Sequence, residues 1–176
     1  MNKEYIHYGH TNFDKALFTP ISNNPTRNKP GGGLWASPKD AAKGWEQWNI
    51  SEGFSVCRKE NSFSFTLSEE ANVIHIKSMD DISLLPLQDS DISKVMKRIG
   101  ILCIDYEALI DAGYDAVELH ISEGAPGLVN ALYGWDCDSI VILNPEIVVP
   151  LEKEIKDAGN LEDIGESFEE EEFEDR

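Results

Sequence analysis

The chain has 176 residues, a hydrophobic content of 41% and a formal net charge of −18. That length suits one domain with a single core, and the charge disfavours non-specific contact with nucleic acid or anionic lipid. No apolar run approaches the roughly 18 residues of a membrane span, and the first residues lack the apolar core of a signal peptide. We therefore expect one cytoplasmic domain over residues 1–155 and an acidic, disordered tail over 156–176.

The first third of the chain predicts a strand, a long loop and a helix. Aromatic and β-branched side chains over residues 4–8 are typical of a short strand. Three successive glycines and several Asn and Pro residues predict a loop over 20–33, and loops of that length often carry function. Ser37 has the position of an N-cap and Pro38 that of a first helical residue, so a helix is expected over 38–48.

The remaining segments are mostly predicted strands with a few short helices between them. They do not alternate as regular βαβ units, so a doubly wound parallel sheet is not expected, and the fold class is α+β. From alternation, apolar runs and cap residues we expect strands over 62–67, 72–77, 114–121, 139–143 and 147–151, and short helices over 80–85, 91–96 and 105–112.

Several familiar catalytic and metal-binding motifs are absent from the sequence. There is no P-loop, GxGxxG, GxSxG, HExxH or paired CxxC. The chain has four histidines, and a metal site would need histidines from distant segments, so no metal is expected. The three cysteines are interpreted as free thiols of a reducing compartment, with one disulfide and a spare thiol as the alternative.

Three segments contain residue types that suit a binding site, and each also has an ordinary structural interpretation. His7–Thr11 follows the first strand, where His7 can also be a core residue and Gly9 a turn glycine. Residues 29–38 join three glycines to Trp35 and Ser37, which suits close approach to a ligand or, equally, a flexible loop before a helix. Residues 135–139 place two carboxylates before a buried strand, at the mouth of a cleft or simply as polar residues at a strand start.

Taken together and in this order, the three segments resemble the ADP-ribosyltransferase superfamily, in particular its small bacterial and phage-associated members. His7 with Gly9 and Thr11 is similar to the first element of the family pattern. Residues 33–37 are similar to the second element, an aromatic and hydroxyl-containing strand. Asp138, at the start of the strand over 139–143, is similar to the acidic third element.

The resemblance implies a fold of two small antiparallel sheets forming a split β-sandwich with a few short helices, and NAD bound in the cleft between the sheets. It implies that His7 holds a ribose hydroxyl and that Asp138 bonds the 2′-hydroxyl of the nicotinamide ribose. These are the expected catalytic residues of a mono-ADP-ribosyltransferase. The implied cofactor-binding residues are Gly9, Thr11, Trp35, Ser37 and Trp45, with a tryptophan ring stacked on the nicotinamide.

Two features depart from the family pattern. The acid is usually Glu, whereas Asp138 is one methylene shorter, and Tyr8 separates His7 from Gly9. Glu118 and Glu123 are rival carboxylates. If Asp138 does not reach the ribose, the resemblance implies a catalytically silent relative.

A non-enzymatic alternative stays open, in which the protein is an acidic interaction or inhibitor protein such as a phage-encoded antagonist. Many like charges raise the rate of association with a cationic partner and make it salt-sensitive. Phe168 and Phe173 within the acidic tail suit docking to a partner groove. In either case we expect a protein acceptor or partner, no direct nucleic-acid binding and no membrane contact. A third possibility is an α+β domain whose motif residues are all structural.

Overall fold

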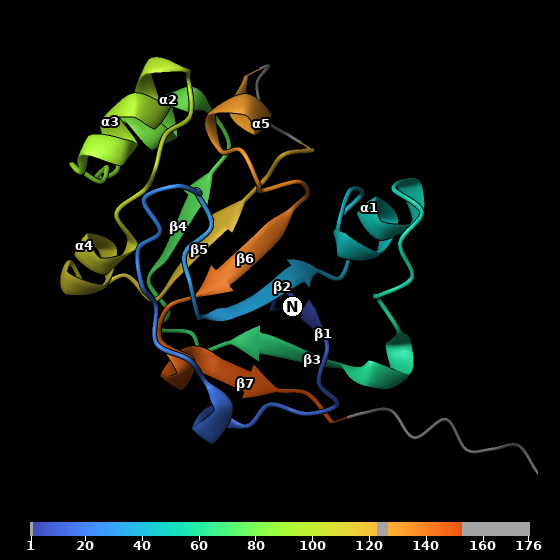
Figure 1. Cartoon of the computed structure of the whole chain (residues 1–176). Helices are drawn as coiled ribbons and strands as arrows, with labels where there is room; N and C mark the ends of the chain where they lie inside the picture. Colours follow the sequence, from blue (N-terminus) through green and yellow to red (C-terminus); the bar gives the residue numbers. More distant parts are fainter. Residues whose placement is uncertain (1, 123–126, 153–176) are drawn as a thin grey trace, which may run out of the picture.

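The computed structural model describes residues 2–122 and 127–152, so the tail over 156–176 and Glu123 lie outside the described residues. The fold is α+β, with one mixed sheet of seven strands in the order β4-β5-β6-β2-β1-β3-β7 and short helices around it (Figure 1). None of the helices in this part of the chain combines the length and apolar character needed to cross a membrane.

The strands are β1 (Tyr5–Tyr8), β2 (Leu34–Pro38), β3 (Ser62–Leu67), β4 (Val73–Ile76), β5 (Ala116–Leu119), β6 (Ser139–Ile142) and β7 (Val148–Pro150). The helices are α1 (Trp45–Ser51), α2 (Met79–Ser83), α3 (Asp91–Arg98), α4 (Tyr106–Asp111) and α5 (Leu128–Ala131), with 3₁₀ turns at Lys15–Leu17, Lys59–Asn61 and Pro145–Ile147.

The predicted helix over residues 38–48 is wrong in its first half, because Pro38 is the last residue of strand β2 and residues 39–44 form turns. Ser37 pairs with Ile6 and Pro38 with Tyr5 in the ladder between β2 and β1. The helix begins only at Trp45, whose N–H donates to the Ser37 hydroxyl at 2.9 Å. Ser37 therefore does serve a helix N-terminus, but it does so from a neighbouring strand, because tertiary pairing overrides the local cap signal.

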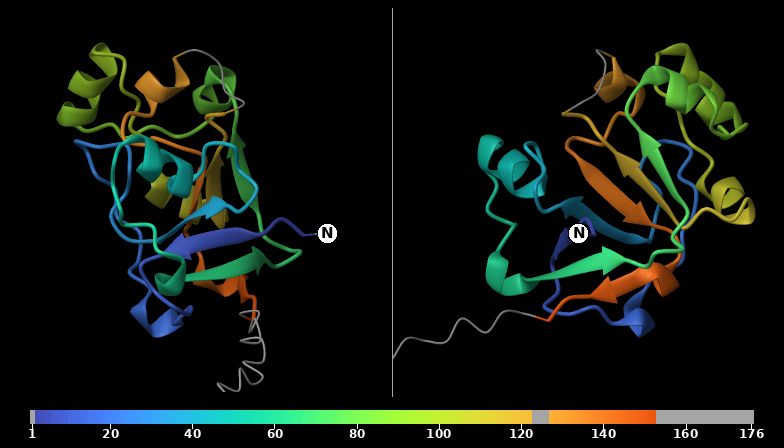
Figure 2. Two further views of the ribbon diagram at one scale, coloured as in Figure 1. Left: turned by 90° about the vertical axis from the view of Figure 1, so that its right-hand side faces the viewer. Right: turned by 180° about the vertical axis from the view of Figure 1, so that it is seen from behind.

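All the strands predicted from alternation and apolar runs form, and they join into one continuous sheet rather than two. The pair β4 and β5 is parallel, whereas every other neighbouring pair is antiparallel. The ladder between β1 and β2 has only two pairs of partner residues, whereas that between β1 and β3 has four. The sheet is strongly twisted and the strand direction changes progressively along it, so β3 and β7 at one end cross the direction of β4 and β5 at the other (Figures 1 and 2).

Strands β5 and β6 are buried on both faces, which explains their apolar character. On one face, Val117, Leu119 and Val141 belong to a cluster with side chains of the helices α2, α4 and α5. On the other face, Ala116, Ile140 and Ile142 pack with aromatic residues of β1 and β3. Because side chains alternate across a strand, a segment covered on both faces becomes an unbroken apolar run. We call these two groups the helix-side core and the inner core.

The long loop over residues 20–33 is fixed to the body of the protein. Asn28 is fully buried, and its side-chain amide donates to the carbonyl of Leu102 at 2.5 Å. Asn23 donates to Asp105 at 2.7 Å and accepts from the Tyr106 N–H at 2.9 Å. These bonds satisfy buried backbone and side-chain groups across the helix-side core. The loop is therefore part of the packed structure.

Gly32 is required by the close approach of this loop to itself. Its φ is +74°, and a Cβ there would lie 2.2 Å from the Pro20 carbonyl oxygen. Gly53 has the same φ of +74° but nothing within 4 Å of the corresponding position. Both Ala variants incur the cost of a left-handed conformation. We expect Gly32→Ala to lower the free energy of unfolding by at least about 1 kcal/mol more than Gly53→Ala, measured by urea denaturation. Equal losses would contradict this steric explanation.

The three cysteines are free thiols, as expected. Cys103 and Cys137 are buried, whereas Cys57 is half-buried. Burial raises the pKa of Cys137 to about 12. Because the thiolate is the reactive form, Cys137 is an inert core residue at neutral pH despite its position beside Asp138.

Candidate functional site

The three segments singled out in the sequence lie on three adjacent strands. His7 belongs to β1, Trp35 and Ser37 belong to β2, and Asp138 directly precedes β6. In the sheet β2 pairs with β1 on one side and with β6 on the other. Residues separated by about a hundred positions in the sequence are therefore neighbours in space.

His7 is held in one tautomer by its two hydrogen bonds. Its Nδ1 lies 2.7 Å from the carbonyl oxygen of Trp35, and its Nε2 lies 3.0 Å from Nδ1 of His10. Since a carbonyl only accepts, Nδ1 carries the proton, and Nε2 of the neutral ring is the acceptor. The ring also stacks on His10 at 5.3 Å and contacts Phe63 at 5.1 Å between centroids.

His7 is expected to make folding stability depend on pH below neutrality. Burial lowers its pKa from the ordinary value of 6.5, against the opposing effect of the bond to the Trp35 carbonyl. As pH falls below 6.5, the unfolded chain binds a proton that the folded protein does not, so stability decreases. Urea unfolding between about pH 5 and 7.5 should show a shallower decrease for His7→Gln than for the wild type. Identical slopes would contradict a neutral, half-buried His7.

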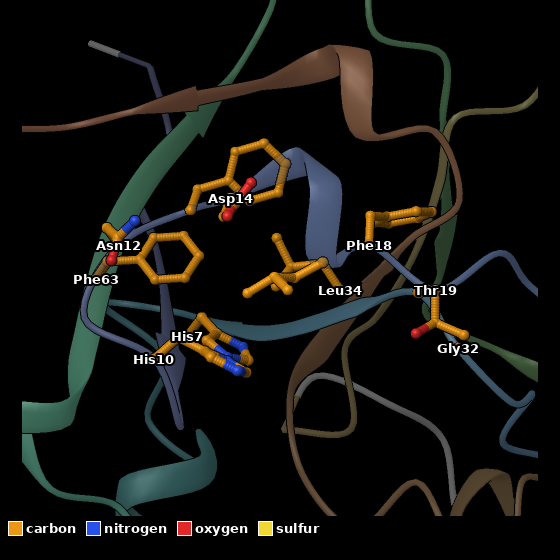
Figure 3. A pocket seen from close by; sticks show the side chains of 12 residues that line it. His7, His10, Asn12, Asp14, Phe18, Thr19, Gly32, Leu34 and Phe63 are labelled. Atoms are coloured by element: carbon orange, nitrogen blue, oxygen red, sulfur yellow. The ribbon is translucent and has the colours of Figure 1, made fainter.

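A cavity of about 270 Å³ opens beside His7 (Figure 3). This is slightly below the range of roughly 300–1,000 Å³ that is common for drug-sized ligands, so it suits an aromatic ring or a sugar better than a whole dinucleotide. The two histidine rings lie one over the other at its wall. It is lined by His7, His10, Asn12, Phe13, Asp14, Leu17, Phe18, Thr19, Gly32, Gly33, Leu34 and Phe63.

Ser37 connects α1 to the segment before β6. Its hydroxyl accepts from the Trp45 N–H and donates to the carbonyl oxygen of Asp138 at 2.8 Å. Ser37 and Asp138 are both buried. The carboxylate of Asp138 accepts from the backbone N–H of Ser122 at 2.8 Å, and the Ser122 hydroxyl donates to its other oxygen. Ser37 thus braces the backbone that presents Asp138, while Ser122 fixes the carboxylate.

Trp35 and His7 leave the sheet on opposite faces. Tyr5 pairs with Pro38 in this antiparallel ladder, so His7, two residues further along β1, lies on the same face of the sheet as Ala36. Trp35 precedes Ala36 in β2, and its side chain therefore lies on the other face. The Trp35 ring packs on the helix-side core, where it meets Trp135 edge-on at 4.9 Å and Lys29 Nζ at 5.4 Å. Its indole N–H donates to the Gly32 carbonyl at 3.2 Å. Trp35 is therefore not a lining residue of the His7 cavity.

The other two residues of the first segment lie at the surface turn after β1. Gly9 has a φ of +121°, which requires glycine, and its N–H donates to the Asn61 carbonyl at 2.8 Å. Thr11 is exposed, and its hydroxyl donates to the Asn12 side chain at 3.3 Å. The Gly9 N–H therefore already has a protein partner in this structure.

Tyr8 lies within the first segment, but the sequence assigned it no role in the site. It alternates with His7, so its side chain leaves the sheet on the face of Trp35 and Ser37. Its hydroxyl lies 3.4 Å from the Glu46 carboxylate, and burial raises its pKa to about 12. Tyr8 therefore offers a neutral hydroxyl beside α1. In the sequence, the feature that could have pointed to Tyr8 is its position between His7 and Gly9.

A second group of ionisable side chains lies on β4, on β5 and at the residue after β5. Glu118, one of the rival carboxylates, is fully buried and lies close to His75 and His120. Glu118 and His120 are two residues apart, so period-two alternation places them on one face of β5. The partnership with His75 depends on the register of β4 against β5, which local sequence patterns do not encode.

No protein-family model matches this chain, and comparison with curated proteins and with solved structures finds no match either.

Proposed function

We propose that this protein is a mono-ADP-ribosyltransferase-like enzyme, which binds NAD and transfers its ADP-ribose to an acceptor at the junction of β1, β2 and β6. The observation that supports this most is the strand order β6-β2-β1. It brings together the three segments on which the resemblance rests, although nothing in their local patterns requires them to meet.

The cavity beside His7 also supports the proposal. The resemblance implies two antiparallel sheets, whereas this sheet is continuous and its β4–β5 pair is parallel, so the support comes from the cavity and not from the shape of the sheet. The volume of about 270 Å³ beside His7 suits one ring system of NAD, so the rest of the dinucleotide would extend along the surface.

In the proposed reaction, one carboxylate stabilises the positive charge that develops on the ribose. When the bond between nicotinamide and ribose breaks, its electron pair leaves with nicotinamide, and the ribose carbon becomes electron-poor until the acceptor forms the new bond and loses its proton. A fixed carboxylate bonded to the 2′-hydroxyl stabilises that state more than the ground state. Asp138 takes this role, with Ser37 bracing its backbone and His7 holding a ribose hydroxyl.

The charge of the protein favours a protein acceptor over nucleic acid. A polyanionic acceptor would need a basic patch to offset its phosphates, whereas this chain carries a net charge of −18. A cytoplasmic location is part of the proposal, because NAD and reduced cysteines belong to that compartment.

The experiment is release of nicotinamide from NAD by the full-length protein, followed together with the melting temperature. We expect NAD to raise the melting temperature and nicotinamide to accumulate in proportion to protein concentration. If NAD leaves the melting temperature unchanged and no nicotinamide accumulates, the proposal is wrong. If the protein instead captures a basic partner in a salt-dependent manner without using NAD, the acidic interaction protein is the correct function.

A further inference from the structure

We propose that His75, Glu118 and His120 form a binding site for a divalent transition metal, with Zn²⁺ as the best match. The three side chains come from β4, β5 and the residue after β5, and each offers one ligand atom to a common centre. None of these three residues has a role in the proposed NAD reaction, so the metal inference does not rest on that function.

The distances between the three ligand atoms fit tetrahedral coordination. Nδ1 of His75 lies 3.2 Å from Nε2 of His120 and 3.2 Å from Oε2 of Glu118. Nε2 of His120 lies 3.8 Å from the same carboxylate oxygen. Zinc bonds of roughly 2.0–2.2 Å at tetrahedral angles separate neighbouring ligand atoms by about 3.3–3.5 Å. The three atoms therefore need only small shifts to surround one ion.

The contacts around Glu118 suit a carboxylate that ligates a metal. Glu118 is fully buried, its Oε1 accepts from Lys3 at 2.6 Å, and its Oε2 accepts from the Tyr5 hydroxyl at 3.1 Å. Such hydrogen bonds fix the orientation of a ligating carboxylate.

The ligand set indicates which metal the site would bind and that one coordination position would stay open. Two imidazoles and one carboxylate are the ligands of zinc sites that keep a fourth position for water or substrate. His75 is 49% exposed on its side chain, whereas His120 is 10% exposed. The ion would therefore be reached from the side of His75, and its open position would face solvent there.

The test is a titration of the full-length protein with ZnCl₂ by calorimetry, and with Co²⁺ by visible absorption. We expect one equivalent to bind with micromolar affinity or tighter, and His75→Ala to weaken binding at least tenfold. His75 is the exposed ligand, so this variant should fold, which circular dichroism verifies. His10→Ala is the matched control, because it removes a histidine elsewhere and keeps every acidic residue.

Two outcomes would overturn the proposal. One is the absence of any micromolar Zn²⁺ binding by the wild-type protein. The other is unchanged binding in His75→Ala, which would assign the metal to surface carboxylates instead. Either result leaves NAD binding and nicotinamide release as separate measurements.

Discussion

Replacing Asp138 with Asn or Ala is expected to reduce the rate of nicotinamide release from NAD by about 10²–10³-fold. The reason is the loss of a negative charge fixed beside the electron-poor ribose in the transition state. Asn retains the shape of Asp: its carbonyl oxygen can still accept from the Ser122 N–H at 2.8 Å, and its amide N–H can donate to the Ser122 hydroxyl, which donates in the wild type. Asp138→Asn should therefore fold like the wild type. Its loss of activity should appear as a lower kcat, with KM little changed. The measurement is steady-state kinetics with NAD, alongside the melting temperature.

Asp136 provides the matched control for this substitution. It lies two residues earlier, is partly exposed, and pairs only loosely with Lys29 at 3.7 Å. Asp136→Ala removes the same charge from the same segment and should leave the rate within about twofold, since surface pairs contribute little. Equal loss in both variants would indicate a general electrostatic effect. Full activity in both Asp138→Asn and Asp138→Ala would refute the assignment of Asp138.

Truncating Glu118 to Ala is expected to lower the free energy of unfolding by about 3 kcal/mol. This is the lower end of the range for breaking a buried ion pair, because the Lys3 side chain is 38% exposed and can return to water. The variant also leaves the buried hydroxyl of Tyr5 without the oxygen that accepts its hydrogen bond. Urea denaturation at neutral pH, in the presence of a chelator, measures the effect without a metal contribution.

The ion pair between Glu4 and Lys39 is the natural comparison. Its N–O distance is 2.8 Å, close to the 2.6 Å between Lys3 and Glu118, but its side chains are 46% and 47% exposed. Glu4→Ala should cost less than about 1 kcal/mol. If the two variants lose the same stability, burial is not what makes Glu118 important.

Local patterns in the sequence were sufficient to predict most elements of the fold. Alternation over 62–67 and the apolar run over 139–143 identify β3 and β6, because burial follows the period of a strand within a few residues. Asp105 identifies the start of α4 in the same way, since its side chain accepts from the backbone N–H of Ala108 three residues later. Such signals are contained within one segment, so no knowledge of the rest of the chain is needed.

The sequence by itself determined the α+β class, the strands and the identity of the polar side chains near their ends. Only the tertiary structure decided which of them meet. Ser37 and Pro38, which the sequence predicts as a helix start, form strand because they pair with β1. The alternation of side chains along the strands places His7 and Trp35 on opposite faces of the sheet. The parallel register of β4 and β5 brought His75 to Glu118 across 43 positions of the chain. Register and face depend on contacts between distant segments, whereas propensity and capping are local.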